Sequence, residues 1–168
     1  LRLAEALEWV GHRVLILDGC KGRTNGFPQT RVIGRPLGFV AALVAECDLA
    51  VGPDSGMLHV AAGVDTPGVG VFASQSPGVT YRYYPLHTWV LPPWDEQRHC
   101  RWPCHWARPA ECSRRRLAAE GKTCAMLARI TVEDVYDAAT AHLERTPAGP
   151  PPTISLPAMR TDRKSTRL

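Results

Sequence analysis

Short apolar runs that alternate with helical patterns constrain the fold of this chain more than any other feature. Each run is too short for a helix core and suits a strand buried on both faces, as in a parallel sheet. The runs occur at residues 14–17, 31–33, 49–51, 69–72 and 88–91. Apolar residues at helical spacing lie among them, at 3–10, 37–46 and 57–62. This alternation predicts an α/β protein with an open, doubly wound, Rossmann-like parallel sheet.

Several residues mark where the expected helices begin and end. Gly11 is a natural C-terminal stop for the first helix, and Pro36 suits the first turn of the second. A last helix is expected over 130–143, where Thr131 is a candidate N-cap and the charges of Glu133 and Asp134 suit the positive N-terminal end.

The 168 residues suffice for one domain with a hydrophobic core. We expect this domain at 1–143, with a Cys-rich insertion at 98–124. Residues 144–168 are Pro-rich and lack periodicity, which predicts a disordered tail. The last seven residues, 162–168, resemble a translated sequencing adapter and are set aside as an artefact. Because the chain starts with Leu1 inside a helical pattern, we expect a truncated N-terminus.

The formal net charge of +4 is too small to indicate nucleic-acid binding by itself. Seven basic and two acidic residues fall between 98 and 122, so the rest of the chain is nearly neutral. The run 114–116 is three arginines, which predicts a solvated face or attraction to an anionic membrane surface. No apolar run approaches the roughly 20 residues that cross a bilayer. Clustered cysteines without a secretory signal favour the cytoplasm.

The segment most suggestive of chemistry is the turn after the third expected strand, Asp54-Ser55-Gly56. In open α/β sheets, ligands bind beyond the carboxyl ends of the strands. The first amides of a helix have no internal partners, so this turn is a candidate phosphate site. Ser55 adds a hydroxyl, Gly56 allows close approach of backbone, and His59 falls on the first helical turn. The alternative is a plain helix cap made by Asp54 or Ser55.

A longer pattern surrounds this turn and runs in a fixed order. It comprises Asp48, Asp54-Ser55-Gly56, His59, Ala61-Ala62, Pro67, Val71-Phe72 and Pro77. The pattern resembles the signature of glycosyltransferase family 9, the ADP-heptose lipopolysaccharide heptosyltransferases. The resemblance extends over about residues 3–143 and is most specific from Asp54 to Phe72.

This resemblance implies a GT-B architecture, in which two Rossmann-like domains face each other across a cleft, and the chain would be its C-terminal, donor-binding half. It places Asp54, Ser55, Gly56 and His59 against the diphosphate and sugar of the donor. It also places Arg35 and Leu37 at the nucleoside end of the pocket, and Asp18 near the ribose.

The implied reaction is transfer of heptose, or a related sugar, from an ADP-sugar to a lipopolysaccharide-core or similar lipid-linked acceptor, with inversion. The general base would belong to the missing N-terminal domain. No catalytic residue is therefore expected in this chain, and we expect the chain alone to be inactive. The resemblance requires no cofactor, and it suits a cytoplasmic enzyme at the inner face of the bacterial inner membrane.

Four cysteines gather in a short segment: Cys100, Cys104, Cys112 and Cys124. Four thiolates suit a tetrahedral Zn or Fe site, although the spacing lacks paired Cys-x2-Cys knuckles. The alternative is a set of reduced cysteines that pack the loop against the sheet with Trp102 and Trp106.

Tyr81, Tyr83 and Tyr84 follow the Pro77 loop. They are either part of a sugar or acceptor face or an aromatic patch that covers a sheet edge. Two further hypotheses for the whole chain stay open. One is a metal-binding module with a basic nucleic-acid-binding face, and the other is a GT-B enzyme that uses another nucleotide sugar.

Overall fold

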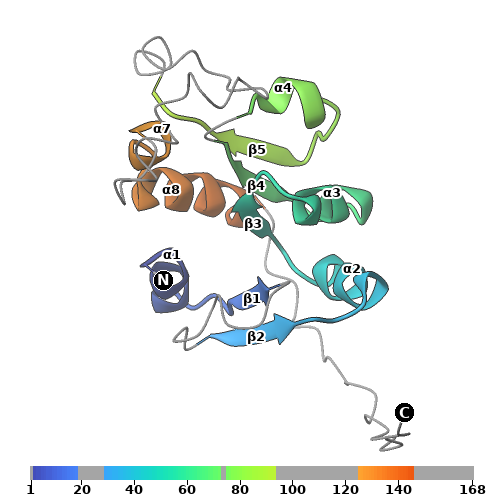
Figure 1. Cartoon of the computed structure of the whole chain (residues 1–168). Coiled ribbons are helices and arrows are strands. Elements are labelled where there is room, and N and C mark those ends of the chain that lie inside the picture. The colour runs from blue at the N-terminus through green and yellow to red at the C-terminus, as the bar shows by residue number, and fades with distance from the viewer. Residues whose placement is uncertain (1, 19–28, 73–74, 94–124, 146–168) are drawn as a thin grey trace, which may run out of the picture.

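The strands of the chain pair only in parallel within the part that the structure describes. This structure is a computed structural model that describes residues 2–18, 29–72, 75–93 and 125–145. The described strands are β1 (Leu15–Asp18), β2 (Thr30–Ile33), β3 (Ala50–Pro53), β4 (Gly68–Val71) and β5 (His87–Val90). β1 pairs with β2, and β3, β4 and β5 form a second sheet in that order (Figure 1).

Helices cover both faces of the three-stranded sheet. The described helices are α1 (Arg2–Trp9), α2 (Leu37–Ala45), α3 (Gly56–Gly63), α4 (Pro77–Thr80), α7 (Ala125–Ala128) and α8 (Val132–Leu143). α3 packs against β3 and β4, whereas α8 packs against β4 and β5. The predicted Rossmann-like α/β class is therefore confirmed. No helix in the described segments has the length and apolar character that a membrane crossing needs.

Two hydrophobic clusters lie on opposite faces of β4. Val69 packs with Val90 and with Val135 of α8 on one face. Phe72 follows β4 on the other face and packs with Leu58 of α3 and Tyr81. This separation follows from the period of two in a strand, which sends successive side chains to opposite faces. The second cluster lies next to the turn that begins α3.

Among the described residues, no backbone hydrogen bonds pair β1 with β3. The strands therefore form two sheets instead of the expected single one. Helix packing connects them, because α1 contacts α8 and α2 contacts α3. The Thr66 hydroxyl also donates to the Val44 carbonyl at 2.8 Å, which links the end of α3 to α2. The two sheets are thus held together by helices.

The prediction that every strand is buried on both faces is wrong for β1 and β3. Leu15 and Val51 are each 37% exposed. Ala50 and Gly52 are half-buried on the face of β3 that α3 can cover, whereas Val51 and Pro53 on its other face are exposed. The physical reason is that α8 packs on β4 and β5 rather than on β3. β4, with a helix on each face, fits the prediction.

Some of the predictions about helix ends are confirmed, and others are not. Gly11 has φ of 96° and its amide donates to the Glu8 carbonyl at 3.0 Å, so it is the predicted stop. Thr131 and Asp134 form a reciprocal capping box at the start of α8. These hydrogen bonds lower the pKa of Asp134. Pro36, however, is the N-cap of α2, one position before the expected first turn. Pro77 begins α4, where only a loop was expected.

The Cys-rich insertion and all but the first two residues of the expected tail lie outside the described residues.

Candidate functional site: the turn that begins α3

The Asp54-Ser55-Gly56 turn lies at the carboxyl end of β3. The Asp54 amide donates to the Val71 carbonyl at 3.3 Å, which ties the turn to the end of β4. Ser55 is the N-cap of α3 in extended backbone, with φ −158° and ψ 162°. Its side chain makes no capping hydrogen bond. The predicted turn therefore forms at the predicted edge of the sheet, and its serine hydroxyl is not used as a cap.

The turn faces outward rather than into the packed interior. Gly56 is exposed, and Asp54 and Ser55 are half-buried. Within the described part of the chain, the amides of Gly56 and Met57 have no hydrogen-bond acceptor. These amides lie at the positive end of the α3 dipole. The geometry thus presents peptide donors to solvent at a point where an anion is favoured.

Tyr81 supports the turn through its hydroxyl group. Its side chain is fully buried, and its hydroxyl donates to Asp54 Oδ1 at 2.9 Å and approaches the Ser55 carbonyl at 3.1 Å. Burial raises the pKa of Tyr81, and the hydrogen bond and negative charge of Asp54 raise it further. One phenol therefore fixes both the side chain of Asp54 and the backbone of Ser55.

His59 projects from the first turn of α3 between two tyrosines. Its ring stacks on that of Tyr81, with centroids 4.4 Å apart and planes 14° from parallel. Its Nδ1 lies 2.7 Å from the hydroxyl oxygen of Tyr84. The side chain of His59 is nevertheless exposed. A polar ring is therefore held in one place beside the turn while part of it stays open to solvent.

The other predicted donor-binding residues lie around the start of α2. Leu37 is 64% exposed, and the Arg35 guanidinium carbon lies 5.6 Å from the centre of the Phe39 ring. No hydrogen bond or ring contact among residues 29–72 and 75–93 joins Arg35 or Leu37 to the α3 turn. Asp18 ends β1, where its carbonyl accepts from the Gly34 amide at 3.4 Å. Asp54, Ser55, Gly56 and His59 thus lie on one turn, and Arg35 and Leu37 lie at the start of α2, which packs on α3.

The model of glycosyltransferase family 9 (heptosyltransferase) matches residues 16–116, which is more than half of the chain. The chain belongs to glycosyltransferase family 9. A comparison with curated proteins finds no match.

Among solved structures, the chain is similar to the crystal structure of a family 9 glycosyl transferase from Veillonella parvula DSM 2008. The TM-score is 0.62 at 17% sequence identity, and the match covers 86% of this chain. It covers 40% of that chain, so this family 9 chain spans well under half of the protein that it resembles. At this identity the likeness supports the fold alone.

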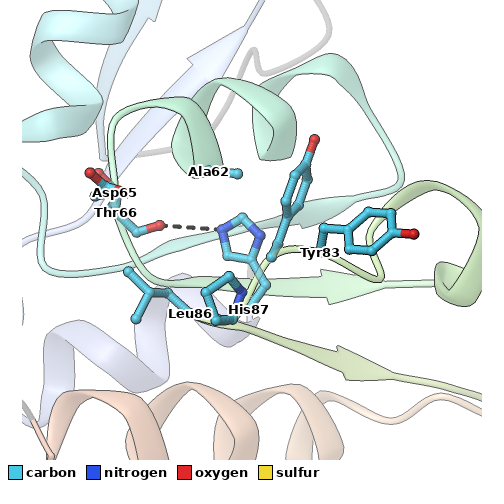
Figure 2. A pocket seen from close by; sticks show the side chains of 8 residues that line it. Ala62, Asp65, Thr66, Tyr83, Leu86 and His87 are labelled. Atoms are coloured by element: carbon cyan, nitrogen blue, oxygen red, sulfur yellow. Dashed lines mark hydrogen bonds between the residues drawn. The ribbon is translucent and has the colours of Figure 1, made fainter.

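One described cavity lies away from the turn, between the C-terminal end of α3 and the start of β5. Its volume is about 270 Å³. Asp65, Thr66, Tyr83, Tyr84 and His87 are among the residues that line it. Figure 2 shows His87 with its hydrogen bond to the Thr66 carbonyl, 3.2 Å long. Burial lowers the pKa of His87. None of the predicted donor-binding residues lines this cavity.

The predicted metal ligands Cys100, Cys104, Cys112 and Cys124 lie outside the described residues. Inside them, no group of three or more His, Cys, Asp or Glu side chains is arranged for a metal ion. Cys47 is half-buried and its thiol donates to the Leu43 carbonyl at 3.3 Å. Burial raises the pKa of the Cys47 thiol, which disfavours the reactive thiolate form.

Tyr81 and Tyr84 are the residues around the turn whose role the sequence did not assign. The two alternatives for the tyrosine segment were a sugar or acceptor face and a patch over a sheet edge. Tyr81 instead is a buried support of the turn, while Tyr83 is 82% exposed. The four-residue helix α4 separates the tyrosines from β4 and turns them back toward α3. Pro77, which suits the first turn of a helix, is the sequence signal that could have revealed α4.

Proposed function

We propose that this chain is the donor-binding half of an inverting glycosyltransferase that takes its sugar from a nucleotide diphosphate. The observation that carries the proposal is the exposed N-terminus of α3, where Gly56 and Met57 present amides without acceptors in the described structure. Membership of family 9 supports it independently. In this proposal the donor is an ADP-sugar, with heptose or a related sugar as the group transferred.

Charge stabilisation at the leaving group is the chemistry that this turn offers. When the bond from the sugar to the diphosphate breaks, negative charge accumulates on the diphosphate. Fixed amides, a serine hydroxyl and a histidine N–H stabilise that charge without having to reorient during the reaction. We assign these roles to Gly56, Met57, Ser55 and His59.

Asp54 has a different role in the proposal, because its Oδ1 accepts from Tyr81. A carboxylate directed at a diphosphate would repel it. We therefore assign Asp54 to holding the turn, with its second oxygen available to a sugar hydroxyl. Arg35 and Leu37 are proposed for the nucleoside end, where an exposed guanidinium and an apolar side chain suit a base and its ribose.

The acceptor and the general base belong, in this proposal, to a part of the protein that the chain does not contain. The acceptor is a lipopolysaccharide core or a similar lipid-linked sugar, and the enzyme acts at the cytoplasmic face of the inner membrane. We accordingly expect the chain alone to bind the donor nucleotide but not to transfer sugar.

Calorimetric titration of the purified chain with ADP, UDP and GDP tests this proposal. We expect ADP to bind best, and His59→Ala to weaken ADP binding by about tenfold, as for the loss of a hydrogen bond to a charged group. Gly52→Ala is the matched control for Gly56→Ala, because an added Cβ meets nothing within 4 Å at either position. Only the Gly56 change should weaken binding. Absence of binding to all three nucleotides would overturn the proposal.

The four cysteines at 100–124 remain a proposed site for Zn or Fe, supported by their number and proximity in the sequence. Elemental analysis of purified chain, before and after Cys104→Ser and Cys112→Ser, tests it. About one equivalent of metal, lost in the variants, is the expected result. Less than about a tenth of an equivalent in the wild type would leave packed, reduced cysteines as the interpretation.

A further inference from the structure

The contacts of His59 point to a role for Tyr84 beyond the two alternatives that the sequence offers. The Tyr84 hydroxyl lies 2.7 Å from Nδ1 of His59, from a residue 25 positions away in the chain. The Tyr84 ring also meets the His59 ring edge-on, with centroids 5.6 Å apart. The contact therefore fixes both the position of the imidazole and the atom that it turns toward the tyrosine.

The chemistry of the pair decides which atom donates. Phenol is a stronger acid than neutral imidazole, and imidazole is a stronger base than phenol. The favoured arrangement of the neutral pair therefore has the Tyr84 O–H donating to the Nδ1 lone pair. The ring proton of His59 must then reside on Nε2, because a neutral imidazole carries one N–H.

Two other contacts fix the plane of the His59 ring, and the hydrogen bond to Tyr84 then favours the orientation with Nδ1 toward the hydroxyl. The face of His59 stacks on Tyr81, and Tyr81 is itself held by Asp54. Tyr84 packs edge-on against Tyr81 as well, with centroids 5.4 Å apart. The rings of His59, Tyr81 and Tyr84 thus pack together. Tyr81 is bound to the turn, and His59 is exposed.

We propose that Tyr84 is a positioning residue that sets the tautomer of His59, so that Nε2–H is presented as a donor beside the α3 N-terminus. Its value for a diphosphate rests on the function proposed above. A donor at Nε2 adds to the Gly56 and Met57 amides, whereas the opposite tautomer would turn a lone pair toward the anion. Tyr84 would thereby convert an exposed histidine into a fixed anion-binding group.

The tautomer can be measured without any ligand, by long-range ¹H–¹⁵N NMR of the histidine rings at a pH where His59 is neutral. The His59 signals are assigned by their loss in His59→Asn. We expect a protonated Nε2 and an unprotonated Nδ1 in the wild type. Tyr84→Phe should move the nitrogen shifts toward a mixture of tautomers. The control, Tyr83→Phe, removes a hydroxyl from the neighbouring, 82% exposed tyrosine and should leave the shifts unchanged.

The consequence for binding is measured on the same proteins. Tyr84→Phe should weaken ADP binding by about two- to tenfold, the range for one hydrogen bond, with no change for Tyr83→Phe. A wild-type proton on Nδ1, or shifts that Tyr84→Phe leaves unaltered, would overturn the proposal. So would a changed tautomer with unchanged ADP affinity. If the wild type binds no nucleotide, the function proposed above fails, while the NMR result still decides whether Tyr84 sets the tautomer.

Discussion

Replacing Tyr81 by Phe tests how the turn is held, because it removes one oxygen and keeps the ring. The lost hydroxyl donates to Asp54 Oδ1 at 2.9 Å and approaches the Ser55 carbonyl at 3.1 Å. The ring contacts with Phe72 and His59, at centroid distances of 5.0 and 4.4 Å, stay available to phenylalanine. The variant therefore separates the hydrogen bonds from the packing.

The expected loss of stability follows from the two acceptors. A hydrogen bond to a charged group contributes about 1.5–3 kcal/mol and a neutral one about 0.5–1.5 kcal/mol. Asp54 is half-buried, so water replaces part of what it loses. We therefore expect Tyr81→Phe to lower the free energy of unfolding by about 1–2 kcal/mol, below the sum of the two bonds. Tyr83→Phe, on an exposed ring, should change it by less than about 0.5 kcal/mol.

Urea denaturation followed by circular dichroism measures this difference, and its pH dependence adds a second check. The pKa of Tyr81 is raised in the folded state, so the fold favours the neutral phenol. The stability that this provides is fully present below the ordinary tyrosine pKa of about 10 and declines as the pH rises above it. The gap between wild type and Tyr81→Phe should narrow above about pH 10. Equal stability of Tyr81→Phe and Tyr83→Phe at pH 7 would refute the reasoning.

Two further predictions concern the core below the site. Gly68→Ala should lower the free energy of unfolding by about 1–3 kcal/mol, as overpacking does, because the added Cβ would overlap the His87 ring. In the control, Gly52→Ala, the added Cβ meets no neighbour. Equal denaturation midpoints for these two variants would contradict the packing. Burial lowers the pKa of His87 in the folded state, so the fold favours its neutral form. The stability that this provides is fully present above the ordinary histidine pKa of about 6.5. It is lost as the pH falls through the lower pKa of the folded state. The stability of the wild type should therefore decline as the pH falls below about 6.5, and less steeply in His87→Gln. Parallel profiles would exclude His87 as a cause.

The order of strands and helices could be predicted because each signal is local. The apolar run before Gly52 and the glycine after α1 act within a few residues, and both are where the pattern placed them. The turn at Asp54 is also predictable from the residues next to it in the sequence. Its exposure leaves its amides accessible, as a phosphate site requires.

The support of the turn could not be predicted, because it depends on contacts across 25 to 27 residues. Tyr81 and Tyr84 reach α3 only because α4 reverses the chain after β4. A tyrosine pattern alone does not distinguish a buried phenol from an exposed one such as Tyr83. The break between β1 and β3 is likewise a matter of how helices pack, which apolar runs do not encode.

Backbone amide NMR during a titration with ADP tests the central proposal most directly. If the start of α3 holds the diphosphate, the amide signals of Gly56 and Met57 should shift most, and adenosine at the same concentration should leave them in place. ADP that binds while these two signals stay fixed would contradict the account, as would equal shifts with adenosine.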